Sequence, residues 1–225
     1  MKRAASRTKS LAMAWMAVAM TLAACQSSPA DSTATPATPQ TIALQPNDLP
    51  GMQRCAVSGD VASVLKQEKA QSSPSYDRNA TEWEQWKRQG ATSAYFAVFG
   101  RTASDCAAAS NASTGAPTGG LMVALVVEFR DTNGAARNFQ RDSTLMGLGP
   151  GNIRFIQLAG GTTTYGQATG LGIDSAIGNA VVGGANYFVA MWQSKSFQSE
   201  FISYDLNLGD ADTAVMAVNR RILQT

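Results

Sequence analysis

The sequence predicts an α+β fold, in which one mainly antiparallel β-sheet is flanked by helices within a single domain. Two observations support this class. Segments 121–129 and 186–193 are apolar almost without a break, as in strands that are covered on both faces of a sheet. The order of predicted elements is helices, strands, a helix, several strands and a final helix, which lacks the regular alternation of a parallel sheet.

The predicted helices are marked by capping residues. Asp60 is a good N-cap for a helix that follows it directly. Thr81 and Glu84 have the spacing of a capping box, which predicts a second helix that ends near Gly90. Two further helices are predicted, over 131–142 and 210–223.

The predicted strands differ in how their apolar residues are arranged. Residues 93–99 form a further apolar strand, whereas residues 201–208 alternate between apolar and polar, which predicts a half-exposed strand near a sheet edge. Residues 147–184 hold eleven of the twenty glycines and are predicted to form short β segments divided by turns. The Gly-, Ser-, Thr- and Pro-rich run 110–120 is predicted to be a flexible connection.

The N-terminus has the pattern of an export signal. The first ten residues carry four basic side chains and no acid, and Leu11–Ala24 contains no charge. This apolar run has fourteen residues, whereas a helix that crosses a bilayer needs about 20. A basic start, a short apolar middle and small residues at the end predict a signal peptide rather than a membrane span.

The apolar run ends at Leu22-Ala23-Ala24-Cys25, which resembles the lipobox of bacterial lipoproteins. In that family the cysteine sulfur carries a diacylglycerol, and the leader is cleaved just before it. The resemblance implies that residues 1–24 are a lipoprotein signal peptide and that Cys25 is the lipidation site. Fatty acyl chains such as palmitate then attach the protein to a membrane. Ordinary secretory cleavage nearby, with Cys25 incidental, is the alternative.

Residues 25–45 are predicted to be the lipidated cysteine and a flexible tether. Ser, Thr, Ala and Pro dominate residues 26–40, where Asp31 is the only charge, so burial cannot offset the entropy of ordering this segment. The single predicted domain covers residues 46–225, which is long enough for one sizeable core.

The net charge and the cysteine content limit which functions the protein can have. Removal of residues 1–24 takes away four basic residues and no acidic one, so the net charge changes from +2 to −2. A nearly neutral domain lacks the basic surface that binds nucleic acid. Cys55 and Cys106 remain in the domain, and outside the cytoplasm they most simply form one disulfide. Two separate buried thiols are the alternative.

The sequence lacks histidine and the complete motifs of several common catalytic sites. The chain has no histidine, which excludes Ser-His-Asp and Cys-His arrangements and metal sites built from nitrogen and sulfur ligands. Ser63 and Lys66 match S-x-x-K, but the S-D-N and K-T-G motifs of penicillin-binding enzymes are absent from the sequence. One acidic cluster lacks the spacing of an EF-hand calcium loop, and it consists of Asp205, Asn207, Asp210 and Asp212. We therefore expect no enzyme, no metal site and no cofactor.

Several stretches of the domain resemble a set of exported bacterial lipoproteins. The stretches are "NDLPG" near residue 49, "VVEFRDTNGAARNF" over 126–139 and "ADTAVMAVNRRI" over 211–222. The chain is similar in these to LpqN-like proteins and to the extracellular sensor domains of PknH-type kinases. The resemblance implies an antiparallel sheet flanked by helices and an extracytoplasmic binding or sensing role, and it assigns no catalytic residue.

The sequence analysis thus predicts a lipid-anchored lipoprotein of the bacterial cell envelope, on the outer side of the cytoplasmic membrane or in the outer membrane. Its domain is expected to bind or sense a protein or a small molecule without catalysis. The alternative is a carrier that encloses an apolar molecule or lipid between sheet and helices. Tyr76, Trp83 and Trp86 are the candidate ligand or partner surface, although a packing face against the sheet explains the same spacing.

Overall fold

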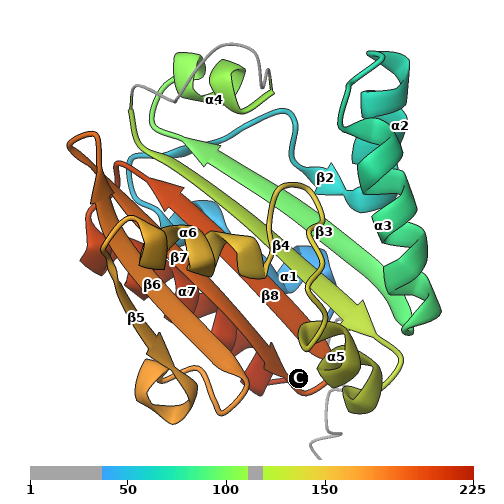
Figure 1. The fold of residues 1–225 in the computed structure, drawn as a ribbon. Helices are drawn as coiled ribbons and strands as arrows, with labels where there is room; N and C mark the ends of the chain where they lie inside the picture. The colour runs from blue at the N-terminus through green and yellow to red at the C-terminus, as the bar shows by residue number, and fades with distance from the viewer. Residues whose placement is uncertain (1–36, 111–118) are drawn as a thin grey trace, which may run out of the picture. The chain divides into compact units, whose positions relative to one another are not determined.

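An antiparallel sheet of eight strands forms the centre of the residues that the computed structural model describes, 37–110 and 119–225 (Figure 1). The strands follow the order β1-β3-β4-β8-β7-β6-β5, and β2 also pairs with β3. Their bounds are β1 Gln53–Arg54, β2 Gly59–Asp60, β3 Ala91–Gly100, β4 Leu121–Phe129, β5 Thr162–Tyr165, β6 Ser175–Val182, β7 Ala185–Ser194 and β8 Phe197–Tyr204. This sheet, with helices on both faces, confirms the predicted α+β class.

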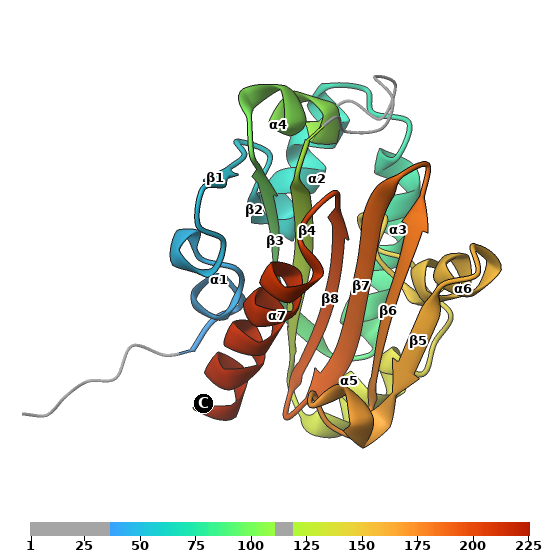
Figure 2. The ribbon, with the colours of Figure 1, turned by 90° about the vertical axis from the view of Figure 1, so that its left-hand side faces the viewer.

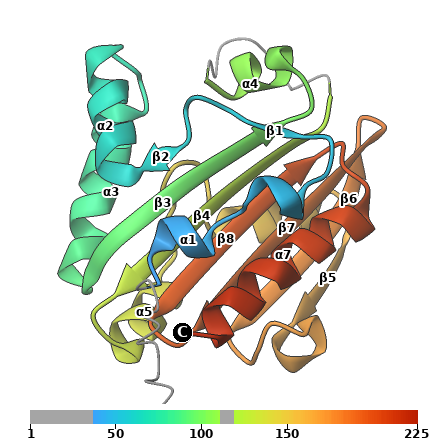
Figure 3. The same ribbon diagram turned by 180° about the vertical axis from the view of Figure 1, so that it is seen from behind.

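Helices cover both faces of the sheet, as the edge-on view in Figure 2 shows. One face, called here the α7 face, is covered by α1 (Pro39–Ile42) and α7 (Leu208–Leu223), and Figure 3 shows both in front of the sheet. The opposite α3 face carries α2 (Val61–Ala70), α3 (Tyr76–Arg88), α5 (Thr132–Phe139) and α6 (Pro150–Leu158). The remaining helical segments are η1 (Pro46–Asp48), α4 (Ala103–Ser110) and η2 (Gly166–Thr169).

Apolar side chains fill the space between the helices and the sheet. On the α7 face, Trp192 and Phe201 stack with ring centroids 5.2 Å apart beneath α7. The α3 face has two hydrophobic clusters. One gathers side chains of α2, α3, β3 and β4, and the other gathers side chains of α6, β6 and β7. The two clusters lie over the two halves of the sheet.

Several predicted elements are present, and α2 has the cap that the sequence predicts for it. The Asp60 side chain accepts a hydrogen bond from the backbone N–H of Ser63 at the start of α2. The Asp131 side chain accepts one from Gly134 at the start of α5. Strands β4 and β7 occupy the two apolar segments that the sequence places inside the sheet.

The strand predicted over 201–208 is neither half exposed nor at an edge. Strand β8 spans Phe197–Tyr204 and lies between β4 and β7. Of the polar residues that suggested exposure, Ser203 is buried with Ser199 where α7 covers the sheet, whereas Asp205 and Asn207 are exposed but lie beyond the end of the strand. The small side chains of the two serines allow the helix to approach the strand closely.

Two helices differ from the sequence prediction. Helix α3 begins at Tyr76, so Thr81 and Glu84 lie inside it and do not cap it. Helix α6 occupies part of the glycine-rich region that was predicted to be β, with Pro150 at its first turn and Ile153 and Ile156 buried. The glycines before it serve close packing, because a Cβ on Gly149 would lie 2.3 Å from the carbonyl oxygen of Ser143.

The folded unit already includes residues before the predicted boundary at residue 46, since α1 packs on the sheet. Ile42, Ala43 and Leu44 are buried on the α7 face. Arg221 of α7 donates hydrogen bonds to the backbone carbonyls of Ile42 and Ala43 and forms a two-pronged ion pair with Asp48, with distances of 3.0 and 2.6 Å. The start of the domain is thus fastened to its last helix.

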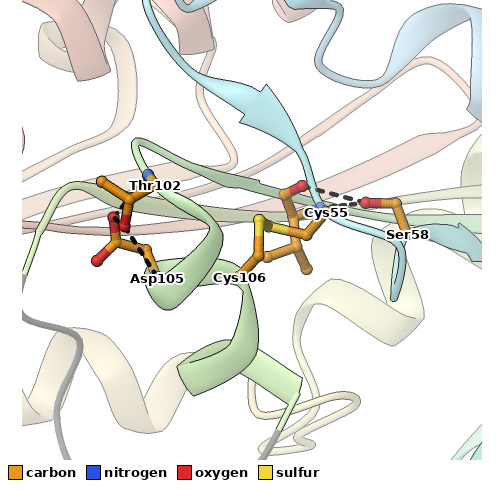
Figure 4. The surroundings of a disulfide bond; sticks show 6 residues. Cys55, Ser58, Thr102, Asp105 and Cys106 are labelled. Carbon is orange, nitrogen blue, oxygen red and sulfur yellow. Dashed lines mark hydrogen bonds between the residues drawn. A yellow bond between two sulfur atoms is a disulfide. The ribbon is translucent and has the colours of Figure 1, made fainter.

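Cys55 and Cys106 form the predicted disulfide, with their Cα atoms 5.2 Å apart (Figure 4). The bond joins the segment after β1 to α4, across a sequence separation of 51 residues. Ser58 supports the same segment, because its hydroxyl donates to the carbonyl of Val98 and accepts from the Val98 N–H. The disulfide therefore holds the short β1–β2 segment against the β3 edge.

Replacement of both Cys55 and Cys106 with serine is expected to lower the free energy of unfolding by about 2–4 kcal/mol, because the unfolded chain regains the freedom of a long loop. Urea denaturation of the domain measures the change. The serine variant in the presence of reductant is the control, since reductant lowers the stability only of the wild type. The four samples are the wild type and the serine variant, each with and without reductant. The same unfolding midpoint in all four contradicts the prediction.

Candidate functional site

A cleft of about 610 Å³ lies on the α3 face. Phe96 of β3, with Val57 and Val64, supplies apolar lining, and α2 and the turn into α3 form a polar wall. Ala109 of α4 and the Met146–Gly147 segment line it as well. The polar side chains that line this cleft are Gln67, Glu68, Gln71, Ser72, Ser73, Ser75, Arg78 and Asn79.

A network of hydrogen bonds fixes the polar wall of the cleft. The Glu68 carboxylate accepts from the Ser75 hydroxyl at 2.8 Å and from the Asn79 amide at 2.9 and 3.2 Å. The Asn79 side-chain oxygen accepts from the backbone N–H of Met146 at 3.2 Å. Asn79 is 2 % exposed, so its bonds are shielded from water. The network therefore joins α2, α3 and the Met146 segment into one preformed wall.

Backbone strain gathers at this cleft. Four residues other than glycine have positive φ within the described ranges, and two of them, Ser72 at 53° and Met146 at 55°, line the cleft. Residues in left-handed conformations cost free energy and persist where the surrounding structure holds them. Such strain is typical of binding and catalytic sites, and here it sets the shape of two parts of the rim.

The aromatic residues proposed from the sequence lie elsewhere. Trp83 is 7 % exposed and Trp86 is fully buried, where its ring stacks on Phe129 with centroids 6.3 Å apart. Both therefore belong to the packing face of α3 and offer no surface to a ligand or partner. Tyr76 is half-buried beneath the ammonium group of Lys69 and is not among the residues that line the cleft.

The remaining site residues predicted from the sequence are the three cysteines. Cys55 and Cys106 are paired, as described above. Cys25, the predicted lipidation site, lies outside the described residues. Within the described ranges no group of three or more His, Cys, Asp or Glu side chains is placed to hold a metal ion, and no helix is long and apolar enough to cross a membrane.

A chain of buried polar groups crosses the same face and was not predicted. It starts at α3, where Glu82 accepts from the Trp86 indole N–H and from Arg141. Arg141 also donates to the Asn138 side chain, whose amide donates to Gln198 of β8 at 2.9 Å. Gln198 in turn donates to Glu200 at 2.7 Å. These polar side chains separate the two apolar clusters of the α3 face.

Glu200 is the most unusual member of this network. Its side chain is 2 % exposed, and its Oε2 atom has no hydrogen-bond partner among the described residues. Burial raises the pKa of Glu200 to about 7, although the hydrogen bond from Gln198 acts to lower it. The cross-strand neighbours, Leu125 of β4 and Met191 of β7, are apolar. The carboxyl group is therefore protonated in mildly acidic solution.

Comparisons with known proteins assign neither a family nor a function to the chain. No family model and no curated protein matches the chain. Among solved structures, the chain is similar to the extracellular domain of PknH from Mycobacterium tuberculosis, with a TM-score of 0.44 and 10 % identity. The alignment covers 85 % of this chain and 99 % of that domain. A TM-score this low does not relate the ligands or functions of the two proteins.

The stability of the domain is expected to fall as the pH rises from about 4.5 to about 7, because the unfolded chain then releases the Glu200 proton while the folded protein retains it. The loss is complete above pH 7 and is on the order of 3 kcal/mol. The Glu200→Gln variant lacks this loss, so it should match the wild type near pH 4.5 and exceed its stability near pH 8.

Urea denaturation at these two pH values tests the prediction. The chain has no histidine, so the window is free of the side chain that ordinarily titrates there. Glu84→Gln is the matched control, since this carboxylate is exposed on α3. If wild type and Glu200→Gln lose the same stability between the two pH values, Glu200 is not the group responsible.

Proposed function

We propose that this protein is a lipid-anchored bacterial lipoprotein whose domain binds a ligand outside the cytoplasm without catalysis. The observation that carries the binding role is the preformed cleft between α2, α3 and β3, which has one polar wall and an apolar floor. Its volume of about 610 Å³ lies within the range of small-molecule sites. The disulfide supports an oxidising location, and the lipobox with Cys25 supports attachment to the membrane.

The chemistry of the cleft favours a ligand rich in hydroxyl and amide groups. The amide and hydroxyl side chains of the wall can donate and accept hydrogen bonds, and the Glu68 carboxylate can accept them. Arg78 adds one cation. The apolar lining around Phe96 can contact the less polar face of such a ligand. Short glycopeptides of the bacterial cell wall have these groups and are found where a lipoprotein of the envelope resides. We therefore assign the cleft to a cell-wall glycopeptide.

The alternative function is that of a carrier for an apolar molecule. A carrier needs an apolar cavity that excludes water from its cargo. The cleft has a polar wall whose charged and amide groups would lose hydration if they faced a lipid. This cost favours the binding module over the carrier at this site. We propose no catalytic role, because the chain lacks the histidine of Ser-His-Asp and Cys-His arrangements.

Lipid attachment at Cys25 is tested by metabolic labelling with a palmitate analogue in a bacterial host that processes lipoproteins. The wild type is expected to incorporate the label and to sediment with membranes, whereas Cys25→Ser should do neither, because only the thiol accepts the lipid. Cys55→Ser serves as a control for loss of a cysteine in general. A labelled Cys25→Ser variant, or an unlabelled wild type, overturns the anchor.

Ligand binding is tested by titration of a soluble disaccharide-peptide from digested peptidoglycan into the domain. Joint replacement of Gln67 and Gln71 with alanine is expected to weaken binding about thirtyfold, because each amide removed costs on the order of 1 kcal/mol. Gln67 on α2 and Gln71 at its C-cap are both exposed, so folding should be unaffected. The matched control replaces Lys87 and Arg88 with alanine, at the other end of α3 and outside the cleft.

Two results contradict this proposal. The first is glycopeptide binding that the cleft variant and the control variant weaken equally. The second is absence of glycopeptide binding in a protein whose native mass spectrum shows one tightly bound lipid per chain. The second result supports the carrier instead.

A further inference from the structure

A second hollow lies on the same α3 face as the cleft, but over the other half of the sheet, which contains β5, β6 and β7. Its volume is about 310 Å³, it is open to solvent, and it is lined by α6, by the end of α5 with the residues after it, and by strands β5, β6 and β7. None of its lining residues lines the glycopeptide cleft. Figure 1 shows the separation, with α2 and the start of α3 at the β3 edge and α6 over β6 and β7.

The inner part of this hollow is apolar. Ala176 of β6 and Met191 of β7 reach it from the sheet, and they are 5 % and 6 % exposed. Phe139 lines it at the end of α5, and Pro150 lines it at the start of α6. A bound molecule there would bury an apolar body of about the size of one aromatic ring with a short chain.

Two guanidinium groups line the same hollow. Arg141 is held in place by hydrogen bonds to Asn138, Glu82 and Gln85, with its side chain 27 % exposed. A cation fixed in this way loses little conformational entropy when a further anion approaches it. The structure therefore presents one preorganised positive charge beside the apolar surface.

Arg154 of α6 is the more available of the two cations. It pairs with Asp142 at 3.0 Å, but the two side chains are 56 % and 68 % exposed. Exposed ion pairs contribute about 0–1 kcal/mol, so Arg154 can exchange Asp142 for another carboxylate at little cost. Arg141 is paired with Glu82 and Arg154 with Asp142, so the charges of these four side chains balance. A ligand carboxylate would therefore bind mainly at Arg154, by exchange with the exposed Asp142.

An aromatic side chain completes the mouth of the hollow. Tyr165 of the edge strand β5 is 53 % exposed, and its hydroxyl accepts a hydrogen bond from the Gln157 side chain of α6 at 2.8 Å. The bond bridges α6 and β5 and holds the tyrosine at the rim. An exposed aromatic side chain beside a partly apolar hollow lined by arginines is typical of sites that bind amphipathic ligands.

We propose that this hollow binds a small organic anion, with an apolar body against Met191 and Ala176 and its carboxylate mainly at Arg154. The site is separate from the glycopeptide cleft and does not depend on the function proposed for it. Binding here connects a ligand to the buried polar network, because Arg141 is shared by both.

The test is titration of the folded domain with 4-phenylbutyrate and, separately, with the uncharged 4-phenylbutyramide, followed by NMR of ¹³C-labelled methyl groups. The carboxylate is expected to bind about tenfold more tightly than the amide and to shift the signals of Met191 and Ala176. Arg154→Gln should weaken carboxylate binding about tenfold and leave amide binding unchanged. The side chain is exposed, so this variant should fold normally.

Arg137→Gln is the matched control, because this exposed arginine on α5 does not line the hollow. Equal binding of acid and amide overturns the proposal, as does a weakening that Arg137→Gln reproduces. Shifts confined to methyl groups of the cleft, such as Val64, place the anion elsewhere and also overturn it. Absence of carboxylate binding in the millimolar range counts equally against it.

Discussion

The pairing of β4 with β8 is the interaction on which the rest of the structure depends. These strands join residues Leu121–Glu128 to residues Phe197–Tyr204 in one continuous register. Strands β1 to β3 lie on one side of this pair, and β5 to β7 lie on the other. The cleft between α2 and α3 belongs to the first side, and the second hollow, lined by α6, belongs to the second. Without this pairing the two halves would share no sheet.

The buried polar network crosses the domain at this same junction. Gln198 and Glu200 lie on β8 itself, and Asn138 and Arg141 link them to α3. A network of this kind stabilises a fold less than apolar packing would, because its groups give up water. It does impose geometry, since each amide and guanidinium must meet its partner. We infer that it fixes how α3 and α5 sit on the sheet.

The elements that follow local rules could be predicted from the sequence. Caps at Asp60 and Asp131 and the unbroken apolar run of β4 locate α2, α5 and the middle of the sheet. The position of β8 could not be predicted, because tertiary packing buries Ser199, Ser203 and Glu200 against their local polarity. Helix α6 was missed because its glycines resemble turn residues, although Pro150 with Ile153 and Ile156 was a usable signal.

The candidate site was less predictable than the fold. The tryptophans of α3 were the most visible feature of the sequence, but helical periodicity places them against the sheet. The cleft is instead formed by common polar residues such as Glu68 and Asn79, which meet only after α2 and α3 fold back on each other. Only the disulfide could be foreseen residue by residue, because the domain holds just two cysteines.

The fastening of Ile42, Ala43 and Asp48 by Arg221 has a mechanical consequence. If the proposed lipid anchor at Cys25 holds the protein at a membrane, a pulling force on the N-terminus would enter the fold near Pro39 and act on the contacts of Arg221 with Ile42, Ala43 and Asp48. Helix α7 would then bear part of this force together with Ile42 and Ala43, so neither segment would separate from the domain by itself. Fraying of the final turn of α7 would weaken the attachment of the whole domain at the opposite end of its sequence.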